Sequence, residues 1–302
     1  MKERILNIET VHQCNCCLGC KTLHPLVSVI DLSKSNLEQQ IIKFDFYTIL
    51  MMEGEIDDIL YGRKYYDYSN ASLVFLTPGE SIKINKSKAL PSEGWLLAFH
   101  PDLISQTSLG EHIKDYSFFF YNPEEALHLS QREKAKAVEC ICNIEEELRH
   151  AIDCHSQILI SRYIELLLDH CNRFYERQFI TRCEANKKIM KKTDVLLKDY
   201  ILSGKLKYNT SPSLGYCAKI LQLSSHYFND LLKFESGKNI DEYFESKRLE
   251  MAKSMLLDSN NTVSVVRKNW DTPIYDTLAV YLKELPEWLR IITDSHRIRN
   301  FF

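Results

Sequence analysis

The sequence predicts an α+β protein in which a β-rich N-terminal part precedes an all-helical C-terminal part. From Leu26 to about Phe120, short apolar runs rich in β-branched and aromatic residues alternate with turn signals. After Asn122-Pro123, the apolar residues recur with the 3.6-residue period of a helix. A chain of 302 residues that is 45% hydrophobic buries a sizeable core and favours two domains.

Four apolar runs are the expected strands, and their even spacing is typical of an antiparallel sandwich or barrel. They occupy residues 26–33, 44–52, 72–84 and 93–100. Turn signals stand at 77–79 and 91–94. An interior lined by aromatic rings could hold a small effector, but we prefer the alternative, a filled core. The candidate rings are Phe46, Tyr47, Phe75, Trp95 and Phe99.

Two amphipathic helices are expected between 123 and 182. Ser130 stands three residues before Glu133, which is the spacing of a capping box. The first apolar face is read as Ala135, Val138, Cys142, Glu145 and Leu148, and the second as Ile158, Ile160, Ile164, Leu167, Leu168 and Cys171. We expect these helices to pack on the β-rich part or on a second subunit, which makes a homodimer the expected assembly.

Composition excludes several classes of protein. The start MKERILNIET lacks the apolar core of a secretory signal, and no run of about 18 apolar residues predicts a membrane span. Ten cysteines without a secretory signal indicate reduced thiols in a cytoplasm.

Charge is distributed unequally along the chain. Residues 183–302 carry 19 basic and 15 acidic residues, whereas residues 1–182 carry 19 basic and 26 acidic residues. This asymmetry is compatible with a phosphate-binding module in the C-terminal part, and equally with chance.

Candidate reactive groups near the N-terminus do not define an enzyme. Cys14, Cys16, Cys17 and Cys20 form C-x-C-C-x-x-C, which is either a soft-metal site or, as we prefer, a set of unpaired thiols on an arm. His24, His100 and His112 are not accompanied by metal-ligating partners at short spacing. The sequence also lacks a glycine-rich phosphate loop, a nucleophile elbow and a zinc-protease helix. We therefore expect no catalytic residues, no metal and no cofactor.

Residues 213–234 have the pattern of a helix–turn–helix. Leu214, Cys217, Ala218 and Leu221 form one apolar face, and Ser224 is a suitable N-cap for a second helix. Tyr227, Phe228, Leu231 and Leu232 of that second helix are expected to face inward. Short polar side chains on the opposite face suit the major groove of DNA, namely Ser225, His226, Asn229, Asp230 and Lys233. The alternative is an ordinary helical hairpin with a solvated face.

Residues 221–260 resemble the AraC/XylS-type transcription regulators. The landmarks are Leu223-Ser224, Tyr227, Leu232-Lys233, Gly237, Tyr243, Arg248-Leu249, Ala252-Lys253 and Leu256-Leu257. The resemblance implies two helix–turn–helix units joined by a long helix, preceded by a cupin-like barrel and dimerising helices. The expected domains are an arm at 1–24, a cupin-like sensor at 25–122, dimerisation helices at 123–182, a DNA-binding part at 183–265 and an aberrant tail at 266–302.

The resemblance also implies roles on the first recognition helix. His226, Asn229 and Asp230 fall on its base-facing positions, where asparagine pairs with adenine and aspartate accepts from a cytosine amino group. Lys233 and Ser225 are better placed for phosphate. His226 is alternatively an ordinary helix-surface residue.

The second helix–turn–helix expected from the family is missing from the sequence. Reading the coding bases in a shifted frame from about Val265–Val266 permits A-E-K-L-G-Y-P-H, and from Ala279 it permits R-I-F-K-R-I-T-G-M-A-P-N-N-Y-R. These peptides contain the family's L-G-Y, F-K, T-G, P and Y-R at the family's spacing. We infer a frame slip near residue 265, the alternative being a divergent member with a genuine different tail.

The sequence therefore predicts a cytoplasmic, effector-responsive regulator that binds double-stranded DNA as a homodimer and is weakened by its tail. The alternative is a dimerising or small-molecule-binding cupin-like protein without DNA activity.

Overall fold

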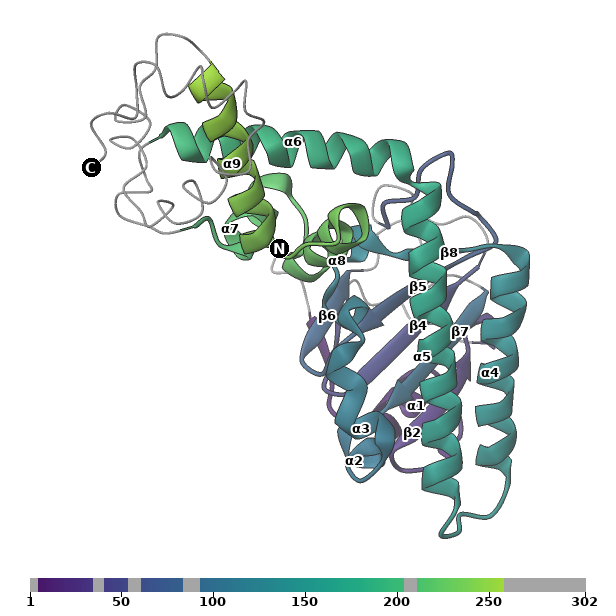
Figure 1. Cartoon of the computed structure of the whole chain (residues 1–302). Helices are drawn as coiled ribbons and strands as arrows, with labels where there is room; N and C mark the ends of the chain where they lie inside the picture. The colour runs from purple at the N-terminus through teal and green to yellow at the C-terminus, as the bar shows by residue number, and fades with distance from the viewer. Residues whose placement is uncertain (1–4, 35–40, 54–60, 84–92, 204–210, 258–302) are drawn as a thin grey trace. The chain divides into compact units, whose positions relative to one another are not determined.

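The structure is a computed structural model, and it describes residues 5–34, 41–53, 61–83, 93–203 and 211–257 (Figure 1). It contains both helices and strands, so the α+β class is confirmed. The chain divides into a first unit, residues 1–183, and a second unit, residues 184–302. All described strands belong to the first unit, and the helices from Glu184 onward form the second.

A five-stranded antiparallel sheet is the centre of the first unit. Its strand order is β2-β7-β4-β5-β8, so strands distant in sequence lie side by side. The sheet consists of β2 (Val27–Asp31), β4 (Tyr47–Met52), β5 (Ala71–Leu76), β7 (Gly94–Phe99) and β8 (Leu127–Leu129). Each of the four apolar runs in the sequence contains one of its strands.

A second sheet has three strands in the order β1-β3-β6. It consists of β1 (Ile5–Ile8), β3 (Ile41–Phe44) and β6 (Glu80–Lys83), with β1 parallel to β3 and β6 antiparallel to it. The turn at 77–79 joins β5 of one sheet to β6 of the other. The described strands thus form two sheets and no closed barrel, so the cupin-like part of the expectation stays a prediction.

Helices accompany the sheets in the first unit. The short α-helices are α1 (Val11–Cys17), α2 (Pro101–Ile104) and α3 (Ser108–His112), and single turns of 3-10 helix lie at 32–34, 113–115, 117–120 and 123–125. The long pair is α4 (Gln131–Arg149) and α5 (Ser156–Thr181), which lie side by side (Figure 1). Residues 101–120, expected to continue the strands, are therefore helical.

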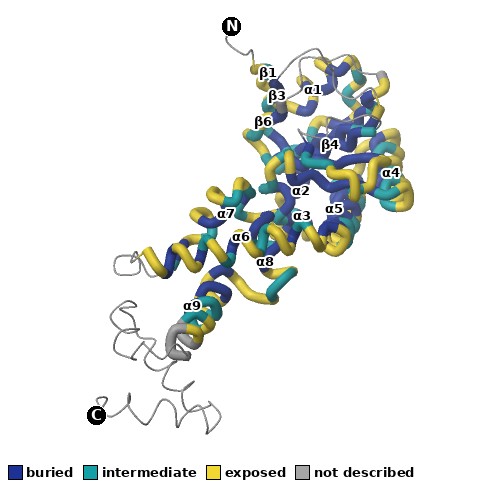
Figure 2. Tube along the Cα trace, turned by 90° about the horizontal axis from the view of Figure 1, so that it is seen from above, coloured by how far each residue is buried: buried dark blue, intermediate teal, exposed yellow. Residues whose placement is uncertain are grey.

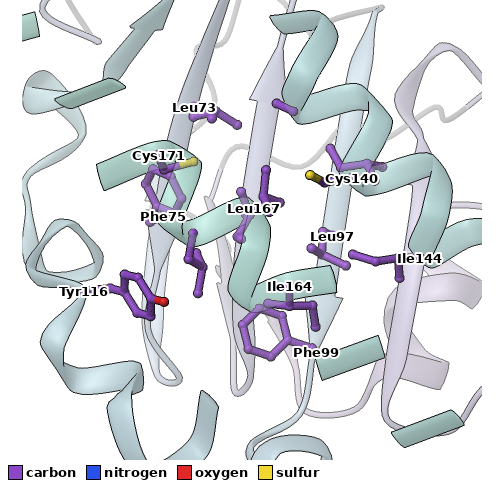
Figure 3. Packing of buried hydrophobic residues seen from close by; sticks show 14 of the residues in the cluster. Leu73, Phe75, Leu97, Phe99, Tyr116, Cys140, Ile144, Ile164, Leu167 and Cys171 are labelled. Carbon is purple, nitrogen blue, oxygen red and sulfur yellow. The ribbon is translucent and has the colours of Figure 1, made fainter. Parts of the chain in front are cut away.

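The five-stranded sheet is buried on both faces, and each face has its own core. Leu73, Phe75, Leu97 and Phe99 point to the side covered by α4 and α5, where Ile144, Ile164 and Leu167 meet them (Figure 3). Their neighbours in the same strands, including Leu50, Val74 and Leu96, point to the other core with β1, β3, β6 and α1. Figure 2 shows β4 in the dark blue of buried residues.

The candidate aromatic rings lie in two packed cores, in agreement with the preferred prediction of a filled core. Phe75 and Phe99 belong to the core beneath the helices, with Tyr47 and Trp95 packed against it. Phe46 belongs to the core between the two sheets. Phe75 contacts Phe118, with ring centroids 4.5 Å apart, and Tyr47 stacks on Phe99 at 5.2 Å. These rings fill packed cores, so they do not form one effector cavity.

The N-terminal segment is part of the fold and not the arm that the sequence predicted. β1 pairs with β3 over four residues, and Ile8, Val11, Cys14 and Leu18 are buried in the core between the sheets. The apolar side chains of this segment cover one face of a sheet, and their burial stabilises the packed arrangement.

Both long helices of the first unit lie within the ranges predicted for them. The capping box of Ser130 and Glu133 is confirmed, since each side chain bonds to the backbone of the other residue. The predicted face of α5 is confirmed except for the exposed Ile158. The predicted face of α4 is wrong apart from Leu148, which is buried, and Val138, which packs part-buried against the core. The buried residues are Ala137, Cys140, Ile141, Ile144 and Leu148.

The second unit is helical throughout its described residues. The polar and basic residues 182–193 predict a linker or the start of a linker helix, and the second of these is observed, since the long helix α6 begins at Cys183. The elements are α6 (Cys183–Leu202), α7 (Leu214–Leu221), α8 (Ser225–Ser236) and α9 (Ile240–Leu257). The predicted helices at 213–221, 224–234 and 240–257 are confirmed within one or two residues.

Candidate nucleic-acid interface

α7 and α8 are joined by a tight connection that the local sequence specifies. Ser213 caps α7 by accepting from the Tyr216 backbone N–H at 3.2 Å, and Ser224 caps α8 by accepting from Tyr227 N–H at 3.1 Å. Between them, Gln222 ends α7 in the left-handed conformation with φ of 59°. The predicted N-cap role of Ser224 is confirmed.

The inner faces of both helices form the core of the second unit. The four residues predicted to face inward from α8 are all buried, as are Cys217 and Ala218 of α7. Of these, Phe228 and Leu232 of α8 and Cys217 and Ala218 of α7 pack with Leu197 and Tyr200 of α6 and with Phe244 of α9. Burial raises the pKa of the Cys217 thiol to about 11, so this thiol is protonated and acts as a small apolar side chain.

Ser225 lies closer to α7 than the sequence predicted. A methyl group added to Gly215 of α7 would lie 3.7 Å from the Ser225 hydroxyl oxygen. The side chain is half-buried, so it is less accessible than a typical phosphate ligand. Glycine at 215 and serine at 225 together allow the first turns of the two helices to approach closely.

The remaining four predicted contact residues share one face of α8. His226, Asn229, Asp230 and Lys233 follow the i, i+3, i+4, i+7 spacing that aligns side chains on a helix. His226 and Lys233 are exposed, whereas Asn229 and Asp230 are half-buried. The Asn229 side-chain N–H donates to Asp230 Oδ1 at 3.3 Å, which leaves the Asn229 carbonyl oxygen available as an acceptor.

Two exposed lysines on the segments that flank α8 in the chain were not among the predicted contact residues. Lys219 lies on α7, and Lys238 follows Gly237, which ends α8 at φ of 69°. The signal in the sequence that could have identified Lys238 is its position directly after Gly237, the residue that ends α8. Both add positive charge on the segments that flank α8 in the chain.

α9 is tied to α6 by polar contacts. Tyr243 donates from its hydroxyl to Asp194 Oδ1 at 2.7 Å, and the Lys247 ammonium lies 3.2 Å from the same carboxylate. Burial and the hydrogen bond to Asp194 raise the pKa of Tyr243. A depression of about 300 Å³ lies beside these contacts, lined by Asp194, Lys198, Ile201, Lys247, Glu250, Met251 and Ser254. Its charged groups mostly pair with one another, which holds α9 in place.

The three histidines singled out in the sequence make local hydrogen bonds or ion pairs. His24 accepts a hydrogen bond from the Leu26 N–H, His100 caps α2, and His112 pairs with Asp115 at 3.1 Å. In the described ranges, no three His, Cys, Asp or Glu residues form a group that could hold a metal ion. The second helix–turn–helix and the tail at 266–302 lie outside the described residues.

Comparison with known proteins gives no family for this chain, since no family model, curated protein or solved structure matches it. Among the helices that the structure describes, none has both the length and the apolar character needed to cross a bilayer.

Proposed function

We propose that the chain is a cytoplasmic transcription regulator of the AraC type, not an enzyme, which binds double-stranded DNA through the outer face of α8. The observation that carries the proposal is the division of α8 into two faces. Its apolar face is buried against α6, α7 and α9, and its other face carries His226, Asn229, Asp230 and Lys233. A helix fixed by its core contacts presents these side chains in a constant geometry, which base reading requires.

Within this proposal, Asn229 and Asp230 contact bases and Lys233 contacts phosphate. The hydrogen bond from Asn229 to Asp230 supports a shared role, because it joins the two side chains and leaves the Asn229 carbonyl oxygen to accept from a base amino group. Lys233 lies one turn further along α8 and is exposed, which suits an ion pair with the DNA backbone.

The first unit is proposed to be a cupin-like sensor that binds a small effector and dimerises. Its two facing sheets support the sensor part of this proposal. Dimerisation is supported by α5, where Leu159 and Leu166 lie two turns apart and are 41% and 46% exposed. The same apolar surface favours the alternative, a dimerising or effector-binding protein without DNA activity.

The decisive experiment measures binding to DNA. Duplexes selected by the full chain from a random pool should bind more tightly than a scrambled duplex, as measured by fluorescence anisotropy at several salt concentrations. Asn229→Ala should weaken binding to the selected duplex by about 1–3 kcal/mol and leave the scrambled duplex unchanged. Lys233→Ala should weaken both and reduce the slope of log K against log salt by about 0.9.

Lys114→Ala is the matched control, since it removes the same charge from an exposed position of the first unit. It should leave both affinities and the salt slope unchanged. Equal losses on both duplexes for Asn229→Ala would reject the base-reading role. Failure to select any duplex would favour the alternative function.

Restoring the reading frame near codon 265 tests the proposed defect. The restored peptide would supply a second set of Arg and Lys side chains, so affinity for the selected duplex and the magnitude of its salt slope should both rise, by about 0.9 in slope for each added phosphate contact. Circular dichroism should show increased helix content. If the two chains bind equally tightly with equal slopes, the inferred frame slip has no functional meaning.

A further inference from the structure

One exposed cysteine of the N-terminal segment lies beside a histidine. Cys16 and His12 are four residues apart on α1, so their side chains share a face of the helix. The Cys16 sulfur is 3.6 Å from His12 Nε2, which is within hydrogen-bonding range for a thiol. Both residues are exposed, so reagents from solution can reach the sulfur.

The histidine ring is held by a third group. His12 Nδ1 lies 2.8 Å from the hydroxyl oxygen of Thr22. The Thr22 oxygen also accepts from the Asn15 side-chain N–H at 3.2 Å, and the buried Asn15 accepts from the Ser28 hydroxyl at 2.6 Å. This chain of hydrogen bonds connects the ring to β2. When Nδ1 donates to Thr22, Nε2 has its lone pair directed to the Cys16 thiol.

We propose that Cys16 is a nucleophilic thiol activated by His12, and that it is a site of reversible modification by low-molecular-weight disulfides. A nucleophile beside a base that a third group orients is the arrangement in which side-chain nucleophiles are activated. Thr22 and Asn15 are positioning residues in this arrangement, because they act on the sulfur through the ring.

The reaction is a thiol–disulfide exchange. His12 Nε2 takes the proton of the Cys16 thiol, and the thiolate attacks one sulfur of the incoming disulfide. A new bond forms between the Cys16 sulfur and that sulfur, while the original S–S bond breaks. The departing thiolate takes the proton from His12, so the products are a mixed disulfide at Cys16 and one free thiol. A second thiol reverses the reaction.

Neighbouring thiols lack this combination of properties. Cys14 is buried, and its pKa is raised to about 12 by burial and by the thiols of Cys17 and Cys20. Cys140 and Cys171 are also buried. Cys154 and Cys183 are exposed and serve as comparison sites within the same chain.

The test measures the reaction rate of each cysteine in the full chain. The chain is treated with oxidised glutathione for increasing times, remaining thiols are alkylated, and mass spectrometry of the peptides gives a rate for each site. At about pH 7 an ordinary thiol is only a few per cent ionised, so Cys16 should react about tenfold faster than Cys154. At about pH 10, where ordinary thiols are largely ionised, the two rates should converge.

His12→Gln should remove the advantage of Cys16 at about pH 7 and change little at about pH 10. Thr22→Val, which removes the hydroxyl that orients the ring, should reduce the advantage part of the way. His112→Gln is the matched control, since it replaces an exposed histidine elsewhere in the first unit. Circular dichroism verifies that each variant is folded.

Two outcomes would overturn the proposal. Equal rates for Cys16 and Cys154 at about pH 7 would show that Cys16 is an ordinary thiol. An advantage that persists in His12→Gln, or at about pH 10, would show that accessibility alone favours Cys16. Neither result depends on DNA binding, so this proposal and the proposed function are tested separately.

Discussion

Replacing Arg182 with methionine is expected to destabilise the first unit by about 3–5 kcal/mol. Arg182 pairs with Asp67 through two parallel hydrogen bonds, from Nε to Oδ1 at 2.9 Å and from Nη2 to Oδ2 at 2.7 Å. The Asp67 side chain is fully buried and that of Arg182 is 9% exposed. Removing the arginine would leave the carboxylate buried without its counter-charge, which accounts for the large effect.

Chemical denaturation followed by tryptophan fluorescence measures this loss. Trp95 lies in β7, and replacing Trp270 and Trp288 with phenylalanine leaves Trp95 as the single reporter among the chain's three tryptophans. The double variant Arg182→Met/Asp67→Leu should recover much of the stability, because neither charge is then buried alone.

A surface pair provides the matched control. Arg149 lies 2.7 Å from Glu145, but its side chain is 68% exposed. Arg149→Met should therefore lower stability by less than about 1 kcal/mol. Similar losses for Arg149→Met and Arg182→Met would show that burial does not distinguish the two pairs.

The second large effect is a loss of stability in acid that arises from His128. This residue of β8 is fully buried, and its Nδ1 lies 2.6 Å from the Ser72 hydroxyl. Burial, with further contributions from Arg182 and Arg63, lowers its pKa to about 4, although Asp67 opposes the shift. The unfolded chain has the ordinary value of about 6.5 and takes up a proton at higher pH than the folded chain does.

The direction of the effect follows from this difference. As pH falls from about 6.5 to about 4, the unfolded state is protonated at His128 while the folded state is not, so the first unit loses stability. The full loss is about 3 kcal/mol, since one pKa unit corresponds to about 1.4 kcal/mol. Above about pH 6.5 both states are neutral at this residue and its contribution is constant.

Unfolding free energies measured across this pH range check the prediction. His128→Gln should flatten the curve between about pH 6.5 and pH 4, whatever its effect on stability at neutral pH. Ser72→Ala, which removes the hydroxyl beside the ring and leaves the histidine in place, should retain the slope. An unaltered slope in His128→Gln would assign the acid sensitivity to other groups.

Helices of the second unit were predictable because their ends are marked in the sequence. Ser213 and Ser224 begin α7 and α8, and Gly237 ends α8, so boundaries agree closely with the structure. The inward residues of α8 were also correct, because four large apolar side chains contrast with a polar opposite face. The proposed DNA contacts themselves stay predictions.

The first unit was less predictable for two physical reasons. β4 and β5 are apolar at nearly every position, so no alternation in the sequence indicates which rings face which core. α4 has Ala and Cys at positions all around the helix, so the sequence allows two apolar faces and only contacts with the sheet select one. The N-terminal segment was missed because β1 is only four residues long and its partner β3 is more than thirty residues away.

The pairing of β2 with β7 has a consequence for synthesis on the ribosome. β2 is made early, yet its neighbour in the sheet spans Gly94–Phe99, and β1 likewise waits for Ile41–Phe44. The nascent chain must therefore carry unpaired apolar segments while more than sixty further residues are added, and such non-local pairing slows folding. Slower translation or a bound chaperone should therefore raise the yield of folded chain. This gain should exceed the gain from changes near the C-terminus of the first unit.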